Sequence, residues 1–332
     1  RIGKLIGATD KEIIITSGAT EADNLAIKGV YDMYSRKGNH IVTVTTEHKA
    51  VLDTCKHLEK QGAQITYLQT DNEGNIDLNE LESVVTDKTI MVAVMYANNE
   101  IGTIAPIRQI ADIAHKKGAL MFSDATQAAG KISIDVDRDG IDLMAFTAHK
   151  MYGPKGVGAL YVRRKNPRVK VTAQMDGGGH ERGMRSGTLN VPGIVGFGKA
   201  CEICMLEMES DTKRIIKLRD KLETSLLLLE EAYVNGSREH RLPHVSNISF
   251  KHVEGEGLLM GFNKNIALSS GSACTSASLE PSYVLKALGL GDDLAHSSLR
   301  FGLSRFTTEE EIDYTIKAIS ETVIKLREMS PL

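Results

Sequence analysis

One cysteine of this chain lies in a run of small and hydroxyl-bearing residues. Ser, Gly, Ala and Thr surround Cys274 on both sides over positions 269–278. Such a run favours neither helix nor strand, so it predicts a mobile loop that presents the thiol to solvent or to a cleft. A structural cysteine is normally buried as a small hydrophobe, whereas a presented thiol suggests a nucleophile. The alternative is an incidental cysteine in a polar surface loop.

Polar and ionisable groups also follow the strands expected in the first half of the chain. These groups lie at 17–21, 47–48, 98–100, 124–127 and 147–150. Any one of them alone is usually a helix cap or an ordinary loop residue. Ligand sites of parallel α/β sheets form outside the carboxyl ends of the strands, so the groups together predict a ligand site at one sheet edge.

The residue types at these strand ends match the needs of pyridoxal 5'-phosphate. This cofactor requires a lysine for a Schiff base and an acid that keeps its pyridine nitrogen protonated, and Lys150 and Asp124 fit these roles. His48 fits as a flat group that stacks on the ring. The phosphate cradle would be formed by Ala19, Thr20, Thr147 and His149. A nicotinamide enzyme is the rival, but the G-x-G-x-x-G fingerprint is absent after the first strand.

Alternating strands and helices are expected to position these groups. Strands are predicted at 12–16, 41–44, 64–68, 89–96, 120–123, 143–146 and 159–162, and helices at 21–37, 50–61, 78–85 and 107–117. The strands are rich in Val, Ile and Thr or almost continuously apolar, as a sheet covered on both faces requires. Their alternation with helices predicts an α/β fold with a mostly parallel sheet and helices on both faces.

A smaller α+β domain is expected after this sheet. A long helix at 195–231 is followed by short strands at 245–250 and 266–269 and by helices at 281–287 and 309–329. We therefore predict a large cofactor-binding domain at residues 1–208 and a small C-terminal domain with the Cys274 loop at 209–332. Residues 1–7 resemble the end of a helix, so a preceding segment is expected.

The composition argues against several other classes of protein. The net charge is −3, with basic and acidic residues interspersed, so neither nucleic acid nor an anionic membrane is expected as the main partner. No apolar run is long enough to span a bilayer, and no signal peptide is visible. The 4 cysteines are too few and too irregular for a disulfide framework, which favours a reducing compartment. Cys201-x-x-Cys204 lies in an expected helix without a second pair at zinc spacing, so no metal site is predicted.

The motifs that contain these residues closely resemble those of the cysteine desulfurases of the IscS/NifS type. They are TSGATE at 16–21, TEHK at 46–49, NNEIG at 98–102, DATQ at 124–127, HKMYGPKG at 149–156, GGGHERGMRSGT at 177–188 and the segment 269–282. The resemblance runs in register over essentially the whole chain and implies a fold-type-I pyridoxal-phosphate enzyme. One departure is Thr147-Ala148 in place of the usual Ser-Gly, which keeps the hydroxyl group.

The resemblance implies a role for each residue of the site. Lys150 would hold the cofactor and remove the Cα proton of L-cysteine, and Asp124 would pair with the pyridine nitrogen. Cys274 would attack the substrate sulfur as a thiolate, which leaves a persulfide on the loop and releases alanine. Gln127 would hydrogen-bond the phenolic oxygen of the cofactor, and His48 would stack on its ring and shuttle protons. Asn99 would orient cofactor and substrate, and Arg300 would bind the substrate carboxylate. Thr188 would reach the phosphate bound by the partner subunit.

The resemblance also implies partners and a location. It indicates a homodimer with shared sites, which passes sulfur to an iron–sulfur scaffold protein and to other acceptors, including those of tRNA thiolation. No resident metal is expected, although Cys274 could transiently ligate a cluster on a scaffold partner. The expected compartment is the bacterial cytoplasm or a mitochondrial matrix.

Three alternatives to an active desulfurase remain at this stage. Another fold-type-I lyase or aminotransferase would have no use for the Cys274 thiol. A selenocysteine lyase-like enzyme could use the same site on the selenium analogue. A shortened, non-catalytic paralogue is the third, because the family's N-terminal arm and C-terminal tail lie outside this sequence.

Overall fold

The computed structural model describes residues 1–262, 265–270 and 280–329, so Cys274 lies outside the described residues. The chain divides into two compact units. The first comprises Arg1–Gln69, Ile76–Ala97 and Ile104–Met208, and the second comprises Thr70–Asn75, Asn98–Thr103 and Glu209–Leu332. The functions predicted for domains 1–208 and 209–332 stay predictions.

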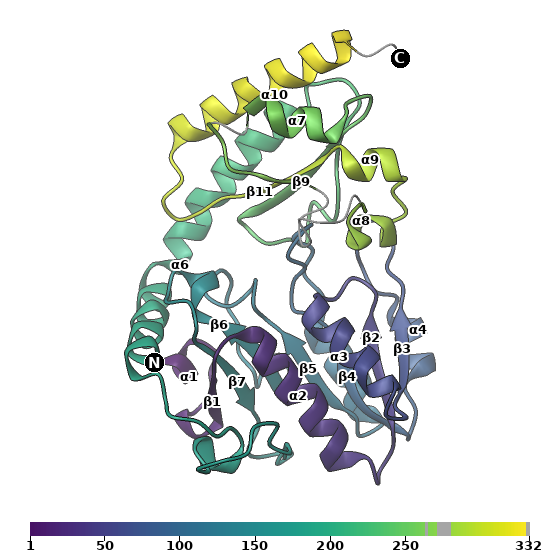
Figure 1. The fold of residues 1–332 in the computed structure, drawn as a ribbon, viewed down its shortest axis with the longest axis vertical. Helices are drawn as coiled ribbons and strands as arrows, with labels where there is room; N and C mark the ends of the chain where they lie inside the picture. The colour runs from purple at the N-terminus through teal and green to yellow at the C-terminus, as the bar shows by residue number, and fades with distance from the viewer. Residues whose placement is uncertain (263–264, 271–279, 330–332) are drawn as a thin grey trace. The chain divides into compact units, whose positions relative to one another are not determined.

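A 7-stranded sheet in the order β1-β7-β6-β5-β4-β2-β3 forms the centre of the first unit (Figure 1). The strands are β1 (Ile13–Thr16), β2 (His40–Val44), β3 (Gln64–Leu68), β4 (Thr89–Ala93), β5 (Leu120–Asp124), β6 (Leu143–Thr147) and β7 (Gly158–Val162). Strands β6, β5, β4, β2 and β3 pair in parallel, whereas β7 is antiparallel to both of its neighbours. The mostly parallel sheet predicted from the sequence is therefore confirmed.

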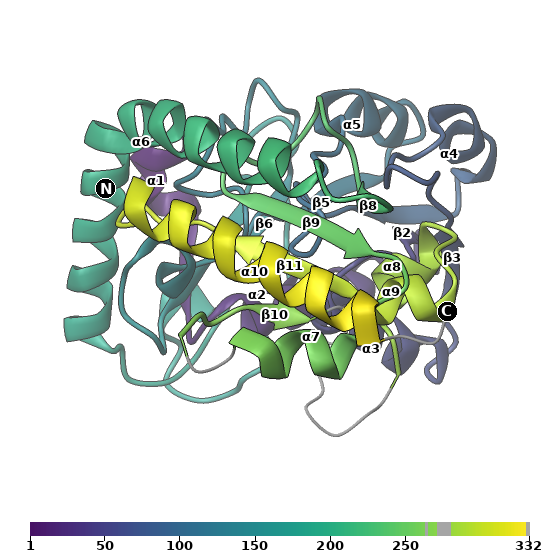
Figure 2. The same ribbon diagram turned by 90° about the horizontal axis from the view of Figure 1, so that it is seen from above.

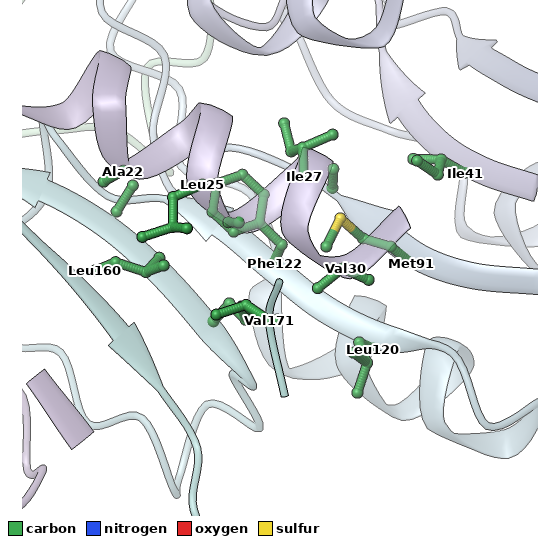
Figure 3. Packing of buried hydrophobic residues seen from close by; sticks show 14 of the residues in the cluster. Ala22, Leu25, Ile27, Val30, Ile41, Met91, Leu120, Phe122, Leu160 and Val171 are labelled. Carbon is green, nitrogen blue, oxygen red and sulfur yellow. The ribbon is translucent and has the colours of Figure 1, made fainter. Parts of the chain in front are cut away.

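Helices cover both faces of this sheet. They are α1 (Ile2–Leu5), α2 (Ala19–Tyr34), α3 (Lys49–Glu59), α4 (Leu78–Val84) and α5 (Ile107–Lys116). In Figure 2, α5 lies on one side of β5 and α2 lies on the other. On the α2 side, Leu25, Ile27 and Val30 pack against Met91 and Phe122 in the main apolar core (Figure 3).

The parallel strands bring their carboxyl ends to one edge of the sheet, and this edge carries the predicted groups. Asp124 and Thr147 are the last residues of β5 and β6, one residue later than the predicted strand ends. The strand predicted at 89–96 is too long, because β4 ends at Ala93. The turn Asn98–Thr103 that follows belongs to the second unit.

The second unit is built around a 4-stranded antiparallel sheet in the order β10-β11-β9-β8. Its strands are β8 (Ala232–Val234), β9 (Val245–Phe250), β10 (Ser269–Ser270) and β11 (Ser298–Gly302), and its helices are α7 (Gly255–Phe262), α8 (Tyr283–Ala287), α9 (Asp292–His296) and α10 (Glu309–Met329). Helix α6 (Val191–Leu226) contributes residues to both units. The strand predicted at 266–269 is wrong, since pairing with β11 begins only at Ser269. Among the helices formed by described residues, none is long and apolar enough to cross a bilayer.

Candidate active site

The first turn of α2 lies beside the end of β6. Gly18 precedes the helix in an extended conformation, and Ala19 and Thr20 open it. A Cβ atom on Gly158, the residue that pairs with Thr147, would lie only 2.7 Å from the Cα of Gly18. This close approach needs a residue without a side chain at 158, and it brings the N–H groups of the helix start to the Thr147 hydroxyl. A helix N-terminus beside a hydroxyl group suits a phosphate.

The segment after β6 carries Lys150. Thr147 is buried, and its hydroxyl donates to the carbonyl of Val157 at 3.1 Å and lies 3.0 Å from Nδ1 of His149. His149 and Lys150 follow on a single 3-10 turn and are exposed. Burial, together with the charges of Lys150 and Lys155, lowers the pKa of His149. A neutral His149 is suited to hold the Thr147 hydroxyl in place.

The buried acid of this edge is Asp124, which is 5% exposed. Burial raises the pKa of its carboxyl, whereas the hydrogen bonds from Thr126, with the backbone N–H at 2.9 Å, and the electrostatic interactions with His48 and Lys150 lower it. His48 is the N-cap of α3, and its Nδ1 accepts the N–H of Ala50 at 3.1 Å. The hydrogen bonds and the charge of Lys150 therefore favour an ionised Asp124, the form that can pair with a protonated ring nitrogen.

The other predicted site residues lie in different surroundings. Gln127, three residues after Asp124, is half-buried, and Thr188, three residues before α6, is exposed. Asn99 and Arg300 belong to the second unit, where the Arg300 guanidinium donates to the Asn99 carbonyl and to the Ser269 hydroxyl, both at 3.0 Å. The Asn99 side-chain carbonyl is buried and has no hydrogen-bond partner among the described residues. Each unit thus holds part of the predicted site.

The strand-end residues of the first unit match the phosphate, the ring nitrogen and the aldehyde carbon of pyridoxal phosphate. A phosphate would lie at the α2 start beside Thr147, and Asp124 is a buried acid in the field of Lys150. Lys150 supplies the amino group close enough to affect Asp124 electrostatically. The chemistry of these groups fits the prediction that Ala19, Thr20, Thr147, His149, Asp124 and Lys150 hold the cofactor.

Two buried acids near Asp124 received no role in the sequence analysis. Asp23 of α2 is 0% exposed, and Glu47 is 1% exposed. Asp23 could have been found as the one acid in the apolar stripe of a helix, since stripes of this kind face a core. Glu47 was noted only as a neighbour of His48.

The cysteines described by the structure behave as core residues. Cys55, Cys201 and Cys204 are all buried, and burial raises the pKa of Cys201 to about 12. The Cys201 sulfur lies 3.9 Å from the Met151 sulfur. A buried thiol with so high a pKa is a poor nucleophile, so Cys201 does not compete with Cys274 for the predicted role.

Comparisons with known proteins identify the family of this chain. The sequence model of the aminotransferase class-V family matches residues 1–315. The chain is 56% identical over 332 residues to the cysteine desulfurase IscS of Photorhabdus laumondii and 57% identical to that of Proteus mirabilis, and it spans 82% of each. Among solved structures, a NifS-like protein superposes with a TM-score of 0.90 at 38% identity, covering 98% of this chain and 86% of that one.

A second NifS-like structure, from Rickettsia africae, superposes with a TM-score of 0.85 at 30% identity, covering 97% of this chain and 85% of that one. The fold and the site define the class of pyridoxal-phosphate-dependent α/β enzymes. Within it, the chain belongs to the aminotransferase class-V family and, more narrowly, to the cysteine desulfurases of the IscS type. The family, the fold class and the cofactor predicted from the sequence are thereby confirmed.

Proposed function

We propose that this chain converts L-cysteine to L-alanine, with transfer of the substrate sulfur to Cys274. The observation that carries the proposal is the 56–57% identity to IscS over the whole chain, together with the buried Asp124 in the field of Lys150 and His48. Iron–sulfur cluster assembly is the proposed use of the sulfur.

Pyridoxal phosphate, when bound, supplies the electron sink that makes the substrate Cα–H bond acidic. Asp124 would stay ionised and hold the protonated ring nitrogen, and Gln127 would hold the phenolic oxygen. The Lys150 amino group would take the Cα proton, and His48 would move protons nearby. In the second unit, Arg300 would bind the substrate carboxylate bidentately and Asn99 would orient the substrate.

The sulfur transfer balances without an outside oxidant. The Cys274 thiolate attacks the sulfur of L-cysteine, so the S–S bond forms as the bond between Cβ and sulfur breaks. The electron pair of the broken bond stays with the carbon, which takes a proton and becomes the methyl group of alanine. The sulfur leaves the enzyme when the persulfide is attacked by an acceptor thiol.

A homodimer is the second part of the proposal. Thr188 would reach the phosphate bound by the partner subunit, so each site would need both chains. Support comes from apolar side chains exposed near the start of α6, with Val191 60% and Val195 63% exposed. The proposed acceptors are an iron–sulfur scaffold protein and the acceptors of tRNA thiolation, and the proposed compartment is a bacterial cytoplasm or an organelle matrix.

The test is an assay of alanine and sulfide after adding L-cysteine and a thiol reductant to the cofactor-loaded chain. We expect both products from the unmodified chain and neither above background from Cys274→Ala or Lys150→Ala. Cys201→Ala serves as the matched cysteine control and should keep turnover. Turnover that survives Cys274→Ala, or that occurs only with L-selenocysteine, would contradict the proposal.

A further inference from the structure

Asp23 lies on the face of α2 that covers the sheet. It starts a stripe with Ala26, Ile27 and Val30, at the spacing i, i+3, i+4 and i+7 that marks one face of a helix. All of these residues are 0% exposed. Ile27 and Val30 lie over the sheet in Figure 3, next to Phe122 and Met91. The Asp23 carboxyl is therefore directed at the sheet from one turn closer to the helix start.

Asp124 points to the same side of the sheet. Side chains alternate along a strand, so Asp124 shares a face of β5 with Leu120 and Phe122, which belong to the core under α2. By the same alternation, Thr43 shares a face of β2 with Ile41. At the carboxyl ends of the strands, the apolar core under α2 is therefore bordered by a buried polar layer. This layer is formed by Asp23, Thr43 and Asp124.

The buried acids differ in the hydrogen-bond donors that stabilise their carboxyl groups. Glu47 accepts the N–H of Met95 at 2.5 Å, and Asp124 accepts the N–H of Thr126 at 2.9 Å. Neither carboxyl oxygen of Asp23 has a hydrogen-bond partner among the described residues. An ionised carboxylate without donors in such a place would cost far more free energy than a neutral acid.

The charges around Asp23 act in the same direction. Burial, and then the negative charges of Asp124 and Glu47, raise the pKa of Asp23 well above its usual range. Burial and Asp124 raise the pKa of Glu47 as well, opposed by the Met95 N–H. Lys150 is a nearby cation that lowers the pKa of Asp124, and the interaction with His48 acts on Asp124 in the same direction.

A thiol on α3 completes the set of titratable groups around this layer. Burial and the charge of Glu47 raise the pKa of Cys55 to about 12, so this thiol stays neutral. It therefore adds no negative charge that would raise the pKa of the nearby acids further.

We propose that Asp23 is a positioning residue that stays protonated in the folded protein, so that the negative charge of this layer remains on Asp124, where the ring nitrogen of the cofactor needs it. The inference rests on the proposed function for its purpose. The protonation state itself can be tested without cofactor. Like charges in one buried site do not all ionise, and the acid without a cation is the one that keeps its proton.

The test compares urea unfolding of the cofactor-free chain and of Asp23→Asn between pH 4 and pH 8. Above a pH of about 4 the unfolded chain loses the Asp23 proton and the folded chain keeps it, so this acid destabilises the fold as pH rises. Asparagine has the same shape and no proton to lose. The measured quantity is a ratio: the unfolding equilibrium constant of the unmodified chain divided by that of Asp23→Asn. We expect this ratio to rise about tenfold per pH unit above a pH of about 4 and to level off at the pKa of Asp23 in the folded chain.

Asp32→Asn is the matched control, because Asp32 is an exposed acid of the same helix. Its ratio should be nearly constant above a pH of about 5. A ratio for Asp23→Asn that is flat or falls with pH would overturn the proposal, since it would mean an ionised Asp23. Asp23→Leu, whose branched end also matches the carboxyl in shape, gives a second comparison, and failure of both neutral variants to fold at pH 7 would equally overturn the proposal.

Two spectroscopic readouts separate this inference from the proposed function. Infrared spectra at neutral pH should show a protonated carboxyl band that Asp23→Asn removes, whether or not cofactor binds. In the cofactor-loaded chain, Asp23→Asn should keep the visible absorption and its pH dependence, whereas a shifted profile would mean that Asp23 carries charge. If the chain bound no cofactor at all, the proposed function would fail, and the infrared and unfolding experiments would still decide the state of Asp23.

Discussion

At the scale of single residues, the site depends on which buried group holds a charge. Asp124 is buried, and burial alone would favour its neutral form, as it does for Asp23 and Glu47. His48 and Lys150 act on Asp124 in the opposite direction. The difference between these acids is thus the charge of Lys150, which links the proposed catalytic lysine electrostatically to the acid proposed to hold the ring nitrogen.

Asp124→Asn tests this reading. Asparagine still accepts the Thr126 N–H, so the fold should persist, but the charge that pairs with the ring nitrogen is lost. We expect kcat for alanine formation to fall by about 10²-fold or more, a typical effect of removing one preorganised electrostatic group. Cofactor-loaded Asp23→Asn is the comparison and should keep most of the activity, so equal losses in the two variants would contradict the reading.

The pH dependence of the reaction follows from the same carboxyl. The folded-state pKa of Asp124 is raised by burial, so protonation at falling pH removes the charge that the cofactor needs. We expect kcat to fall on the acid side, with a slope of one proton, in the unmodified chain. A rate that stays constant down to the pH at which the protein unfolds would contradict this expectation.

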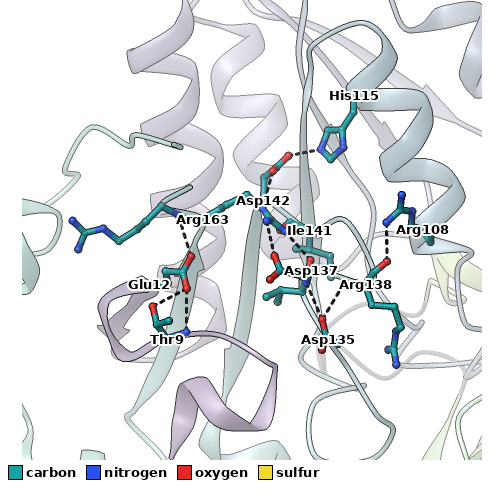
Figure 4. A network of polar contacts seen from close by, with 12 residues as sticks. Thr9, Glu12, Arg108, His115, Asp135, Asp137, Arg138, Ile141, Asp142 and Arg163 are labelled. Atoms are coloured by element: carbon teal, nitrogen blue, oxygen red, sulfur yellow. Dashed lines mark hydrogen bonds and ion pairs between the residues drawn. The ribbon is translucent and has the colours of Figure 1, made fainter. Parts of the chain in front are cut away.

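At the scale of elements, the opposite edge of the sheet is held by a separate polar network (Figure 4). Asp142, just before β6, is 0% exposed and accepts the Met121 N–H at 2.9 Å. It also lies 2.7 Å from Nε2 of His115 and 3.3 Å from Nε of Arg163. One carboxyl thus joins the end of α5 to the amino ends of β5 and β6, far along the strands from the predicted site.

Asp142→Ala should therefore affect stability and leave cofactor binding unchanged. Loss of the acid leaves the buried N–H of Met121 and the largely buried Arg163 without this partner, so we expect unfolding in urea to become about 3 kcal/mol easier. Lys116→Ala, which removes an ion pair between exposed side chains, should cost about 1 kcal/mol or less. Similar losses in both variants would show that the network is not cooperative.

The elements that the sequence predicted well are those whose burial dictates their composition. The strand at 64–68 and the helix at 309–329 match β3 and α10, and the other strands of the large sheet are right within a few residues. The misses lie in the second unit. Strands β8 and β11 and the helices α7 and α9 were not predicted. Strand β11 contains only Leu299 and Phe301 as apolar residues and owes its pairing to β9.

The same contrast applies to the site. Its strand-end residues could be predicted from position and type, since a strand end with a polar group is visible in sequence, and their roles stay predictions. The burial of Asp23 could be predicted from its place in the apolar stripe of α2, but its nearness to Asp124 and Glu47 depends on tertiary packing that no local pattern contains. The segment Asn98–Thr103 belongs to the second unit because of contacts between residues far apart in the sequence, such as the 2.5 Å hydrogen bond from the Ser282 hydroxyl to the Glu100 carboxylate. Contacts of this kind leave no local sequence pattern.

At the scale of the whole molecule, the proposed function includes a homodimer. Val191 and Val195 lie one helical turn apart on α6 and are both exposed, so we propose this face of α6 as part of the interface. Val195→Glu should therefore weaken the dimer, with light scattering over graded concentrations giving the mass. Leu228→Glu, at a position 84% exposed in the second unit, is the control. A Val195→Glu chain that stays dimeric at all concentrations would exclude this face as the interface.

The central claim is that sulfur moves from L-cysteine to one named thiol. The most direct measurement is mass spectrometry of the peptide that contains Cys274, after a single turnover of L-cysteine labelled with a heavy sulfur isotope in the cofactor-loaded chain. The account predicts a gain of one labelled sulfur atom on this peptide, none on the peptides of Cys55, Cys201 and Cys204, and no gain anywhere in Lys150→Ala. Alanine formed without labelled sulfur on Cys274, or label found on another cysteine, would contradict it.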